Sequence, residues 1–303
     1  MKDCIEAVEA AFRARGNGMP AASAIAGLEL DGGTLHAKLG RLDGTRAYAV
    51  AKINANFPLN PEQRRLPTIQ GVLVLFDAQT GEVLSAMRSG MLTALRTAAA
   101  TAVAAKHLAL PDASTIAFVG CGVQAAAHLR ALLLVRPLER IRAFDSNPAV
   151  MARFASQARD SFGLSVEFAP DVRSAVAGSA IVVTSTTARR PLIGIGQLAP
   201  GTFVGAVGAD NHTKHEIDTE LMRTSAVVVD DLDQCSRMGD LHHALAAGLM
   251  EPQDVRASLD QIVCGSVRGR VSEAEIVVFD STGVAIEDVA AAVVVHERLQ
   301  SER

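Results

Sequence analysis

The 303-residue chain has no strong excess of charge of either sign. It carries 29 Lys and Arg against 33 Asp and Glu, and only 20% of its residues are charged. Without a basic excess there is little electrostatic attraction to polyanions, so we expect neither nucleic acid nor a membrane surface as a partner. With 49% hydrophobic residues, the composition indicates a soluble globular protein. Its length suits two domains of about 150 residues.

Long apolar runs and metal-binding spacings are missing as well. The run from Val289 to Val295 is too short to cross a bilayer. The cysteines form no C-x-x-C pair, so we expect free thiols in a reducing cytoplasm. The histidines near residue 215 have no ligand spacing, and no metal site is predicted. These residues are Cys4, Cys121, Cys235 and Cys264, and His212, His215, His242 and His243.

A glycine turn between an apolar strand and a helix is the most informative feature present. It reads Gly120-x-Gly122-x-x-Ala125, and a second strand then ends in Asp145. Gly120 permits a tight turn, while Gly122 lets the backbone approach a pyrophosphate at the helix N-terminus. Asp145 is placed to hold the adenosine ribose, so we expect NAD, with NADP as the alternative. A glycine turn in some other α/β fold is the structural alternative.

The strand and helix patterns differ between the two parts of the chain. Alternating segments separated by turns in the first part predict an antiparallel sheet, followed by a helix over residues 92–110. From residue 115 on, strands alternate with helices, which predicts a doubly wound parallel sheet. We therefore expect an α/β protein with a Rossmann-type domain at 113–283. An α+β domain with a mostly antiparallel sheet would comprise residues 1–112 and the C-terminal helix, about 284–303.

Three polar side chains stand in apolar or strand-end settings. Lys52 lies in an alternating apolar segment, either facing a cleft between domains or solvated on an open sheet face. Arg96 lies among alanines and needs an anionic partner, either a ligand phosphate or carboxylate or an ordinary salt bridge. Asp210 follows a predicted strand at the edge where such sheets bind ligands, which suggests a general base. It could instead cap a helix beginning near His215.

Five separated motifs together resemble the ornithine cyclodeaminase/mu-crystallin family. They cover nearly the whole chain in the family's order. The motifs are Lys52 with Phe57-Pro58 and Asn60; Thr93-x-x-Arg96-Thr97-Ala98-Ala99; Val119-Gly-Cys-Gly-Val-Gln124; Gly208-Ala-Asp210 with Lys214 and Glu216; and Phe279-Asp-Ser-Thr-Gly-Val-Ala-Ile-Glu-Asp288.

The resemblance implies an enzyme that uses a nicotinamide dinucleotide to interconvert an α-amino acid and its imine. It also implies a homodimer formed through the first domain and the final helix. Lys52 matches the lysine at the substrate carboxylate and Asp210 the acid/base carboxylate, while Thr282 falls on a substrate position. The implied cofactor positions are Thr68, Arg96, Gly120, Gly122, Val123, Gln124, Asp145, Thr186, Lys214 and Ser281.

Two departures from the family pattern bear on the substrate. The segment Met19–Ser23 lacks the arginine that usually clamps the substrate carboxylate. The segment His36–Lys38 is basic where ornithine-using members carry a glutamate. If residues 35–39 form a strand, His36 and Lys38 share one face, so we expect Lys38 to help Lys52 clamp the carboxylate.

The leading hypothesis is an NAD-dependent enzyme of ornithine cyclodeaminase type, converting ornithine to proline and ammonia in the cytoplasm. An NAD(P)H-dependent reductase of cyclic imino acids such as pyrroline-2-carboxylate, or an amino-acid dehydrogenase, is the chemical alternative. A non-catalytic nucleotide-binding protein of crystallin type is the alternative of another class. Retention of both Lys52 and Asp210 favours an enzyme, since binding alone requires neither.

Overall fold

The computed structural model describes residues 1–302 and divides into two compact units. The parallel-sheet unit contains residues 97–283 with the first two residues, and the antiparallel-sheet unit contains residues 3–96 and the chain from Val284 onward. The division falls inside α3 (Ser89–Leu108), between Arg96 and Thr97, whereas the sequence predicted a boundary after residue 112. The cofactor and substrate roles of the two parts stay predictions.

The antiparallel-sheet unit is built on one five-stranded sheet with strand order β1-β2-β3-β4-β5. All four pairings are antiparallel, as the alternating segments predicted; β1 was not predicted. Its elements are α1 (Lys2–Gly16), β1 (Ala21–Leu30), β2 (Gly33–Leu42), β3 (Tyr48–Asn56), α2 (Asn60–Arg64), β4 (Ile69–Asp77), β5 (Val83–Arg88) and α11 (Ala285–Ser301).

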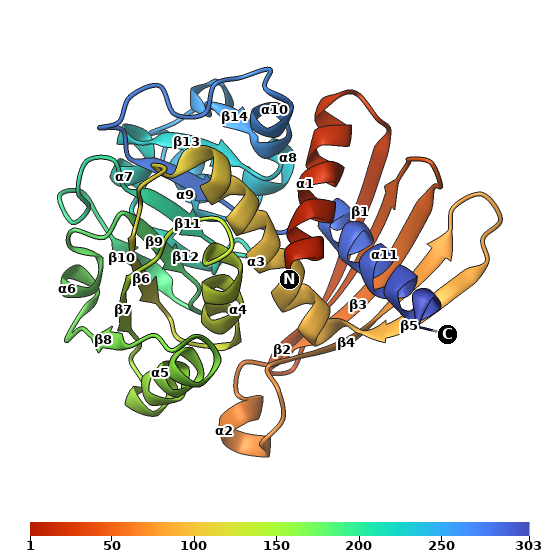
Figure 1. Cartoon of the computed structure of the whole chain (residues 1–303), viewed down its shortest axis with the longest axis horizontal. Coiled ribbons are helices and arrows are strands. Elements are labelled where there is room, and N and C mark those ends of the chain that lie inside the picture. Colours follow the sequence, from red (N-terminus) through yellow and green to blue (C-terminus); the bar gives the residue numbers. More distant parts are fainter. Residues whose placement is uncertain (303) are drawn as a thin grey trace. The chain divides into compact units, whose positions relative to one another are not determined.

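The two faces of this sheet have different surroundings. Helix α11 lies across one face (Figure 1), and it approaches so closely that a Cβ added at Gly40 would lie 2.6 Å from the Cβ of Ala285. Side chains alternate between the faces of a strand, so a second set of apolar residues points the other way. Five of these are more than 40% exposed: Leu28, Leu30, Leu39, Ile53 and Val72. We call this set the outer apolar face.

The parallel-sheet unit contains an eight-stranded parallel sheet of order β14-β13-β15-β11-β9-β6-β7-β8. Reading β8-β7-β6-β9-β11 gives the 3-2-1-4-5 order of a Rossmann fold, as predicted. The sheet strands are β6 (Thr115–Val119), β7 (Arg140–Phe144), β8 (Val166–Phe168), β9 (Ile181–Thr184), β11 (Phe203–Ala206), β13 (Ala226–Val229), β14 (Ala257–Ser258) and β15 (Val277–Asp280).

Helices and a small second sheet complete this unit (Figure 1). The helices are α4 (Val123–Leu132), α5 (Pro148–Phe162), α6 (Val172–Val176), α7 (Thr219–Thr224), α8 (Leu232–Cys235), α9 (Asp240–Ala246), the 3-10 turn Pro252–Asp254 and α10 (Leu259–Cys264). Strands β10 (Arg189–Ile193) and β12 (His215–Ile217) pair in parallel.

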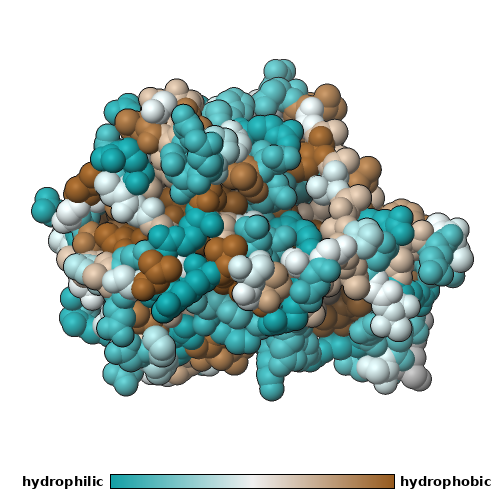
Figure 2. Space-filling view, turned by 90° about the horizontal axis from the view of Figure 1, so that it is seen from above, coloured by the Kyte–Doolittle hydropathy of each residue, from teal (hydrophilic) through white to brown (hydrophobic). Residues whose placement is uncertain are grey.

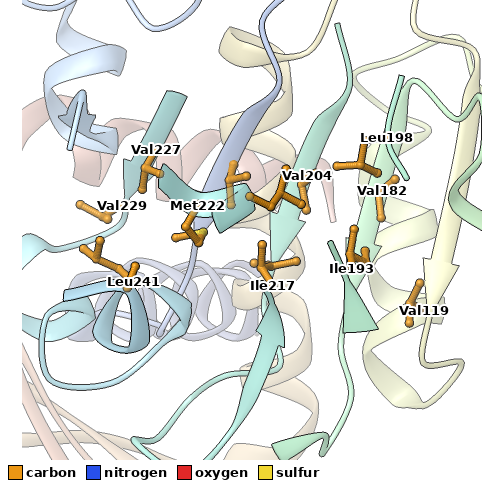
Figure 3. Close-up of a cluster of buried hydrophobic side chains, with 14 of the residues drawn as sticks. Val119, Val182, Ile193, Leu198, Val204, Ile217, Met222, Val227, Val229 and Leu241 are labelled. Carbon is orange, nitrogen blue, oxygen red and sulfur yellow. The ribbon is translucent and has the colours of Figure 1, made fainter. Parts of the chain in front are cut away.

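Alternate residues of the parallel strands fill a core on each face of the sheet. Figure 3 shows one of them, where Val119, Val182 and Val204 lie beside side chains of β10, β12, α7 and α9. On the other face the rings of Phe118 and Phe154 meet edge to face, with centroids 5.1 Å apart. Burial on both faces explains why these strands read as continuous apolar runs.

The helix expected near His215 is not there. Residues 215–217 form β12, and the next helix, α7, begins at Thr219. Its N-cap is Asp218, whose carboxylate accepts the backbone N–H of Glu220 at 2.9 Å. The extended conformation is held by Asp240, which accepts the backbone N–H groups of Glu216 and Ile217 at 2.7 and 2.9 Å. The N-cap interpretation of Asp210 was therefore wrong.

Hydrophilic and hydrophobic residues alternate in small groups over the face shown in Figure 2. Among residues 1–302, no helix is long and apolar enough to span a membrane. The same residues contain no group of three or more His, Cys, Asp or Glu side chains arranged to hold a metal ion. All four cysteines are free thiols, as expected.

Candidate functional site

The predicted site residues divide between the two units. In the parallel-sheet unit they lie in loops at the carboxyl ends of the strands and at the start of α4. This set comprises Gly120, Gly122, Val123, Gln124, Asp145, Thr186, Asp210, Lys214, Ser281 and Thr282. The antiparallel-sheet unit contains Lys38, Lys52, Thr68 and Arg96.

The glycine turn connects β6 to α4 as predicted. Gly120 has a φ of +88°, and a Cβ there would lie 2.7 Å from the carbonyl oxygen of Ser185, so only glycine fits. Gly122 caps α4 without a side chain, and the position of its missing Cβ is open. Val123 is 78% exposed, and the side-chain oxygen of Gln124 is buried with no hydrogen-bond partner among residues 1–302. An uncapped helix N-terminus with open space in front suits an anionic group.

Asp145 stands directly after β7 and is bonded to the glycine turn. One carboxylate oxygen accepts the backbone N–H of Cys121 at 2.8 Å, and the other accepts that of Asn147 at 2.9 Å. Arg142, on the same strand, pairs instead with Glu167 at 3.4 Å and donates to the carbonyl of Ala177. Arg142 is therefore directed to Glu167 and Ala177 rather than to the Asp145 carboxylate beside the turn.

The loop after β9 is tied to the loop after β11 by Glu216. Its fully buried carboxylate accepts from the hydroxyl of Thr184 at 2.6 Å and from the backbone N–H groups of Thr186 and Gly208 at 2.6 and 2.8 Å. Burial raises the pKa of Glu216, because the charged form loses its hydration. Glu216 belonged to a recognised motif, but its sequence gave no sign of this bonding role.

Asp210 is exposed in the middle of this second loop. Its side chain is 43% exposed, and it pairs with Lys214 at 2.7 Å between carboxylate oxygen and Nζ. A carboxylate in contact with water can exchange protons with solvent, which general acid–base catalysis requires. The predicted acid/base residue and the predicted cofactor residue Lys214 are thus in direct contact.

The turn after β15 is closed by a second buried carboxylate, Asp230. It accepts from the hydroxyl of Thr282 at 3.0 Å and from the backbone N–H of Gly283 at 2.6 Å. The hydroxyl of Ser281 donates to it at 3.4 Å. Ser281 and Thr282 are 2% and 4% exposed, so their side chains are fixed from within the fold. Any contact of these residues with a cofactor or substrate stays a prediction.

In the antiparallel-sheet unit, Lys52 is buried in an ion-pair network. It is only 3% exposed, and its Nζ donates to Asp288 at 2.6 Å, so the interpretation as a solvated lysine was wrong. Burial lowers the pKa of Lys52 to about 7; Asp288 opposes the shift, whereas Arg96 and Lys38 add to it. Lys38 lies opposite Lys52 in the register of β2 and β3, so both point to the same face.

Arg96 completes this network. Its guanidinium pairs with Glu287 at 2.8 Å and with Asp288 at 3.0 Å, and it is 5% exposed. The anionic partner that the sequence required is therefore present in α11. Burial acts to raise the pKa of Asp288, but Arg96 and Lys52 outweigh it and hold that pKa below its usual value. Whether Arg96 also contacts a cofactor stays a prediction.

Thr68 immediately precedes β4 and is half-buried. Its carbonyl oxygen accepts the backbone N–H of Phe57 at 2.8 Å, which joins the start of β4 to the end of β3. The segment Met19–Ser23 contains no arginine, and its last three residues are the first three of β1.

The whole chain, residues 1–303, matches the sequence model of the ornithine cyclodeaminase/mu-crystallin family. An alanine dehydrogenase of Archaeoglobus fulgidus is 35% identical over 302 residues, which cover 100% of this chain and 92% of that protein.

Solved structures of similar proteins share the fold over the full chain. An archaeal alanine dehydrogenase dimer with bound NAD is 36% identical, with a TM-score of 0.93 and coverage of 99% and 92% of the two chains. The Δ1-pyrroline-2-carboxylate reductase of Thermococcus litoralis, solved with NADH and L-proline, is 30% identical, with a TM-score of 0.93 and coverage of 99% and 94%. A lysine cyclodeaminase is 30% identical, with a TM-score of 0.87 and coverage of 99% and 87%.

Proposed function

The chain belongs to the ornithine cyclodeaminase/mu-crystallin family, and on that premise we propose that it is an NAD-dependent enzyme interconverting an α-amino acid and its α-imino acid. The buried Lys52–Asp288 pair is the observation that carries the proposal. Burying a lysine costs several kcal/mol of desolvation, which a protein that only binds a nucleotide would have no reason to incur at this position. The crystallin-type alternative is therefore the weaker one.

The cofactor proposal depends on the glycine turn and Asp145. When bound, NAD supplies the hydride acceptor for oxidation and, as NADH, the hydride donor for reduction. Gly122, Val123 and Gln124 present the open start of α4 to the pyrophosphate. Asp145 favours a ribose diol and repels a 2′-phosphate, and Arg142 is engaged elsewhere. We therefore expect NAD(H) to bind more tightly than NADP(H).

The chain's own residues would do the following at the substrate. Lys52, held by Asp288, binds the substrate carboxylate and orients Cα. Asp210 accepts the proton of the α-ammonium group before oxidation, because only the free amine supports loss of hydride from Cα. In the reductive direction the same carboxylate returns that proton to the nitrogen.

The charge of the network favours one class of substrate. Lys38 lies opposite Lys52 in the sheet register, and Arg96 pairs with the same Asp288 as Lys52, so three basic side chains gather here. Basic side chains suit a substrate carboxylate and disfavour a second ammonium group. We therefore place amino-acid dehydrogenase or cyclic imino acid reductase activity first. Ornithine cyclodeamination is the second candidate, favoured by the presence of both Lys52 and Asp210.

We further propose that the protein is a homodimer. The solved alanine dehydrogenase with a TM-score of 0.93 is a dimer. In this chain, β1 is exposed along its entire length, and the outer apolar face gathers Leu39, Ile53 and Val72 on the same side of the sheet. Exposed apolar surface of this kind is usually covered by a partner. The free cysteines also agree with the expected cytoplasmic location.

A substrate panel tests the proposal. NADH oxidation would be followed with pyrroline-2-carboxylate and with pyruvate plus ammonium, and NAD reduction with alanine and ornithine. We expect turnover of at least one amino acid with an uncharged side chain or of a cyclic imine, and slower turnover of ornithine.

Titration of NADH and NADPH into the apo protein tests whether Asp145 selects the ribose of NAD. Equal or tighter NADPH binding would contradict that assignment. Tight NADH binding with no turnover on any substrate would favour the non-catalytic alternative.

A further inference from the structure

Two imidazoles stack beside the loop that carries Asp210. The rings of His215 in β12 and His243 in α9 lie 3.9 Å apart between centroids, with an interplanar angle of 12°. Nε2 of His243 is 2.8 Å from the carbonyl oxygen of Lys214, and Nε2 of His215 is 2.9 Å from that of Ile217. A carbonyl oxygen can only accept, so both Nε2 atoms carry the proton and donate it.

The contact made by His243 is at the end of a short loop, residues 209–214, which we call the acid–base loop. Before the loop, Gly208 is held by the carboxylate of Glu216 at 2.8 Å. After it, the carbonyl oxygen of Lys214 is held by His243. Since Lys214 also pairs with Asp210, fixing the backbone of Lys214 restricts where the Asp210 carboxylate can stand.

Helix α9 presents a second contact to the same segment. Asp240 and His243 are three residues apart, so they lie on one face of the helix. Asp240 accepts the backbone N–H groups of Glu216 and Ile217, while His243 donates to the carbonyl of Lys214. One helix face therefore holds three backbone positions: 214 at the end of the loop, and 216 and 217 in the strand that follows it.

We propose that His243 is a positioning residue for proton transfer by Asp210, acting through the Lys214 carbonyl and the Lys214–Asp210 ion pair. The inference rests on the acid/base role given to Asp210 in the proposed function. His243 does not touch the substrate in this account. Its N–H fixes the end of the acid–base loop, and its stacking on His215 fixes the ring itself.

The same arrangement makes the loop sensitive to acid. His215 faces His243 and Asp218, and His243 also faces His242, whose ring is 5.3 Å away, and Lys214. Burial lowers the pKa of His215, and the neighbouring His243 lowers it further. As pH falls, a charge gained by His215 lies directly against the His243 ring, which opens the stack and loosens the hold on Lys214.

The test compares two substitutions of one residue. His243→Leu removes the donor and should lower kcat at least about tenfold, with KM for NADH changed less than about twofold. His243→Asn keeps an N–H donor and should stay within about threefold of wild type at neutral pH, with a weaker loss of kcat toward acid pH. His212→Asn makes the same chemical change on an exposed residue of the loop and should leave kcat and the pH profile unchanged.

Several outcomes would overturn the inference. If His243→Leu keeps the wild-type kcat at every pH, His243 has no role in positioning Asp210. Equal losses in His243→Leu and His243→Asn, with NADH affinity falling in parallel, indicate a merely structural residue. If His243→Leu does not fold, His215→Phe takes its place, because it keeps a stacked plane but cannot be protonated. That variant should keep the wild-type kcat at neutral pH and lose less kcat than wild type at acid pH. If its kcat falls in acid as steeply as that of wild type, the proposed pH dependence is contradicted.

Amide hydrogen exchange gives a readout that does not need turnover. The peptide covering residues 208–217 should exchange faster in His243→Leu than in wild type, and at the wild-type rate in His212→Asn. Unchanged exchange overturns the inference even in an active enzyme. Faster exchange supports it even where no substrate of the panel is turned over, so that failure of the proposed function is recognised separately.

Discussion

The two units hold their predicted catalytic groups in different ways. Lys52 is buried, and its charge is balanced by Asp288 in an ion-pair network that also contains Arg96 and Glu287. Asp210 is 43% exposed and lies on a loop next to a cluster of fully buried carboxylates. This carboxylate cluster comprises Glu216, Asp230, Asp240 and Asp280.

The burial of Lys52 and the exposure of Asp210 suit the two side chains to different chemical tasks. A buried lysine held by one carboxylate is suited to binding a second carboxylate in one position, while an exposed aspartate can exchange protons with water. Backbone N–H groups and hydroxyls donate hydrogen bonds to the buried carboxylates. Burial raises the pKa of Asp280 to about 8, whereas the network lowers that of Asp288. We therefore expect opposite changes of stability with pH. The stabilisation by Asp288 is lost as pH falls, whereas the stabilisation linked to Asp280 is lost as pH rises.

The largest effect is expected at Asp210. Asp210→Asn removes the proton acceptor and should reduce turnover about 10²–10⁴-fold, with NADH affinity nearly intact because the glycine turn is untouched. Steady-state kinetics and NADH titration measure the two quantities. If turnover per folded molecule is unchanged, Asp210 has no part in proton transfer. The proposed difference in task between Lys52 and Asp210 would then be wrong.

The second largest effect is expected from replacing Asp288, one of the two acids of the ion-pair network. Asp288→Asn leaves Lys52 and Arg96 with one carboxylate between them, and should cost about 3–5 kcal/mol of unfolding free energy at pH 7. Asp288 has a depressed pKa, so its stabilisation is present above its ordinary pKa of 3.8 and is lost as pH falls. The difference from wild type should therefore shrink in acid.

Urea unfolding at pH 7 and at pH 2.5, well below the ordinary pKa of 3.8, checks both statements. Asp43→Asn is a matched control, since Asp43 pairs with Arg41 near the surface and should lose less than about 1 kcal/mol. Similar losses in the two variants would mean that burial adds nothing to the Asp288 pair.

Lys38 tests whether the network also binds substrate. Because Lys38 lies opposite Lys52 in the sheet register, Lys38→Met should raise KM about 10–100-fold, the loss of about 1.5–3 kcal/mol of charge-assisted bonding. An exposed lysine with no role would change KM less than about twofold. Kinetics with the best substrate of the panel separate these outcomes. An unchanged KM would leave the substrate carboxylate without an assigned second partner.

The smallest effect is expected at Asp240. Burial raises the pKa of Asp240 well above its ordinary value, and Asp280 and Glu216 raise it further. One oxygen accepts two N–H groups, and the other has no hydrogen-bond partner among residues 1–302, so an amide fits the site. A raised pKa gives stability that is full below the ordinary value of 3.8 and is lost as pH rises. Asp240→Asn should therefore match wild type at pH 4.

At pH 8, Asp240→Asn should be equal to wild type or more stable by up to about 1 kcal/mol. Unfolding at the two pH values measures the change. A loss of several kcal/mol at pH 8 would show that the charged form of Asp240 is needed, and would remove the contrast with Asp288.

Local patterns in the sequence predicted the fold and the geometry of the glycine turn. The spacing of Gly120 and Gly122, and the strand that ends at Asp145, are properties of short segments, and both parallel and antiparallel sheets followed from strand patterns. The partners of Lys52 and Arg96 are 236 and 191 residues away, in a helix whose packing no local pattern specifies. The sequence therefore required an anion at Arg96 but could not identify Glu287.

The error at His215 has a similar origin. A carboxylate followed by polar residues is typical of a helix start, and the segment after Asp210 was predicted on that basis. The extended conformation of residues 215–217 depends instead on Asp240, in a helix that follows in sequence and contacts the segment only in the fold. Asp218, which does cap a helix, lies three residues after His215 and was overlooked.

Transfer of deuterium from the cofactor to the substrate carbon is a direct test of whether the protein moves hydride between NADH and an imino acid. The protein would be incubated with NADH carrying deuterium at C4 of the nicotinamide and with pyrroline-2-carboxylate or pyruvate plus ammonium, and the amino acid formed would be analysed by mass spectrometry. We expect one deuterium on Cα of the product, of a single configuration, and none in Asp210→Asn on the same timescale. NADH that binds tightly but delivers no deuterium to any product would contradict the account.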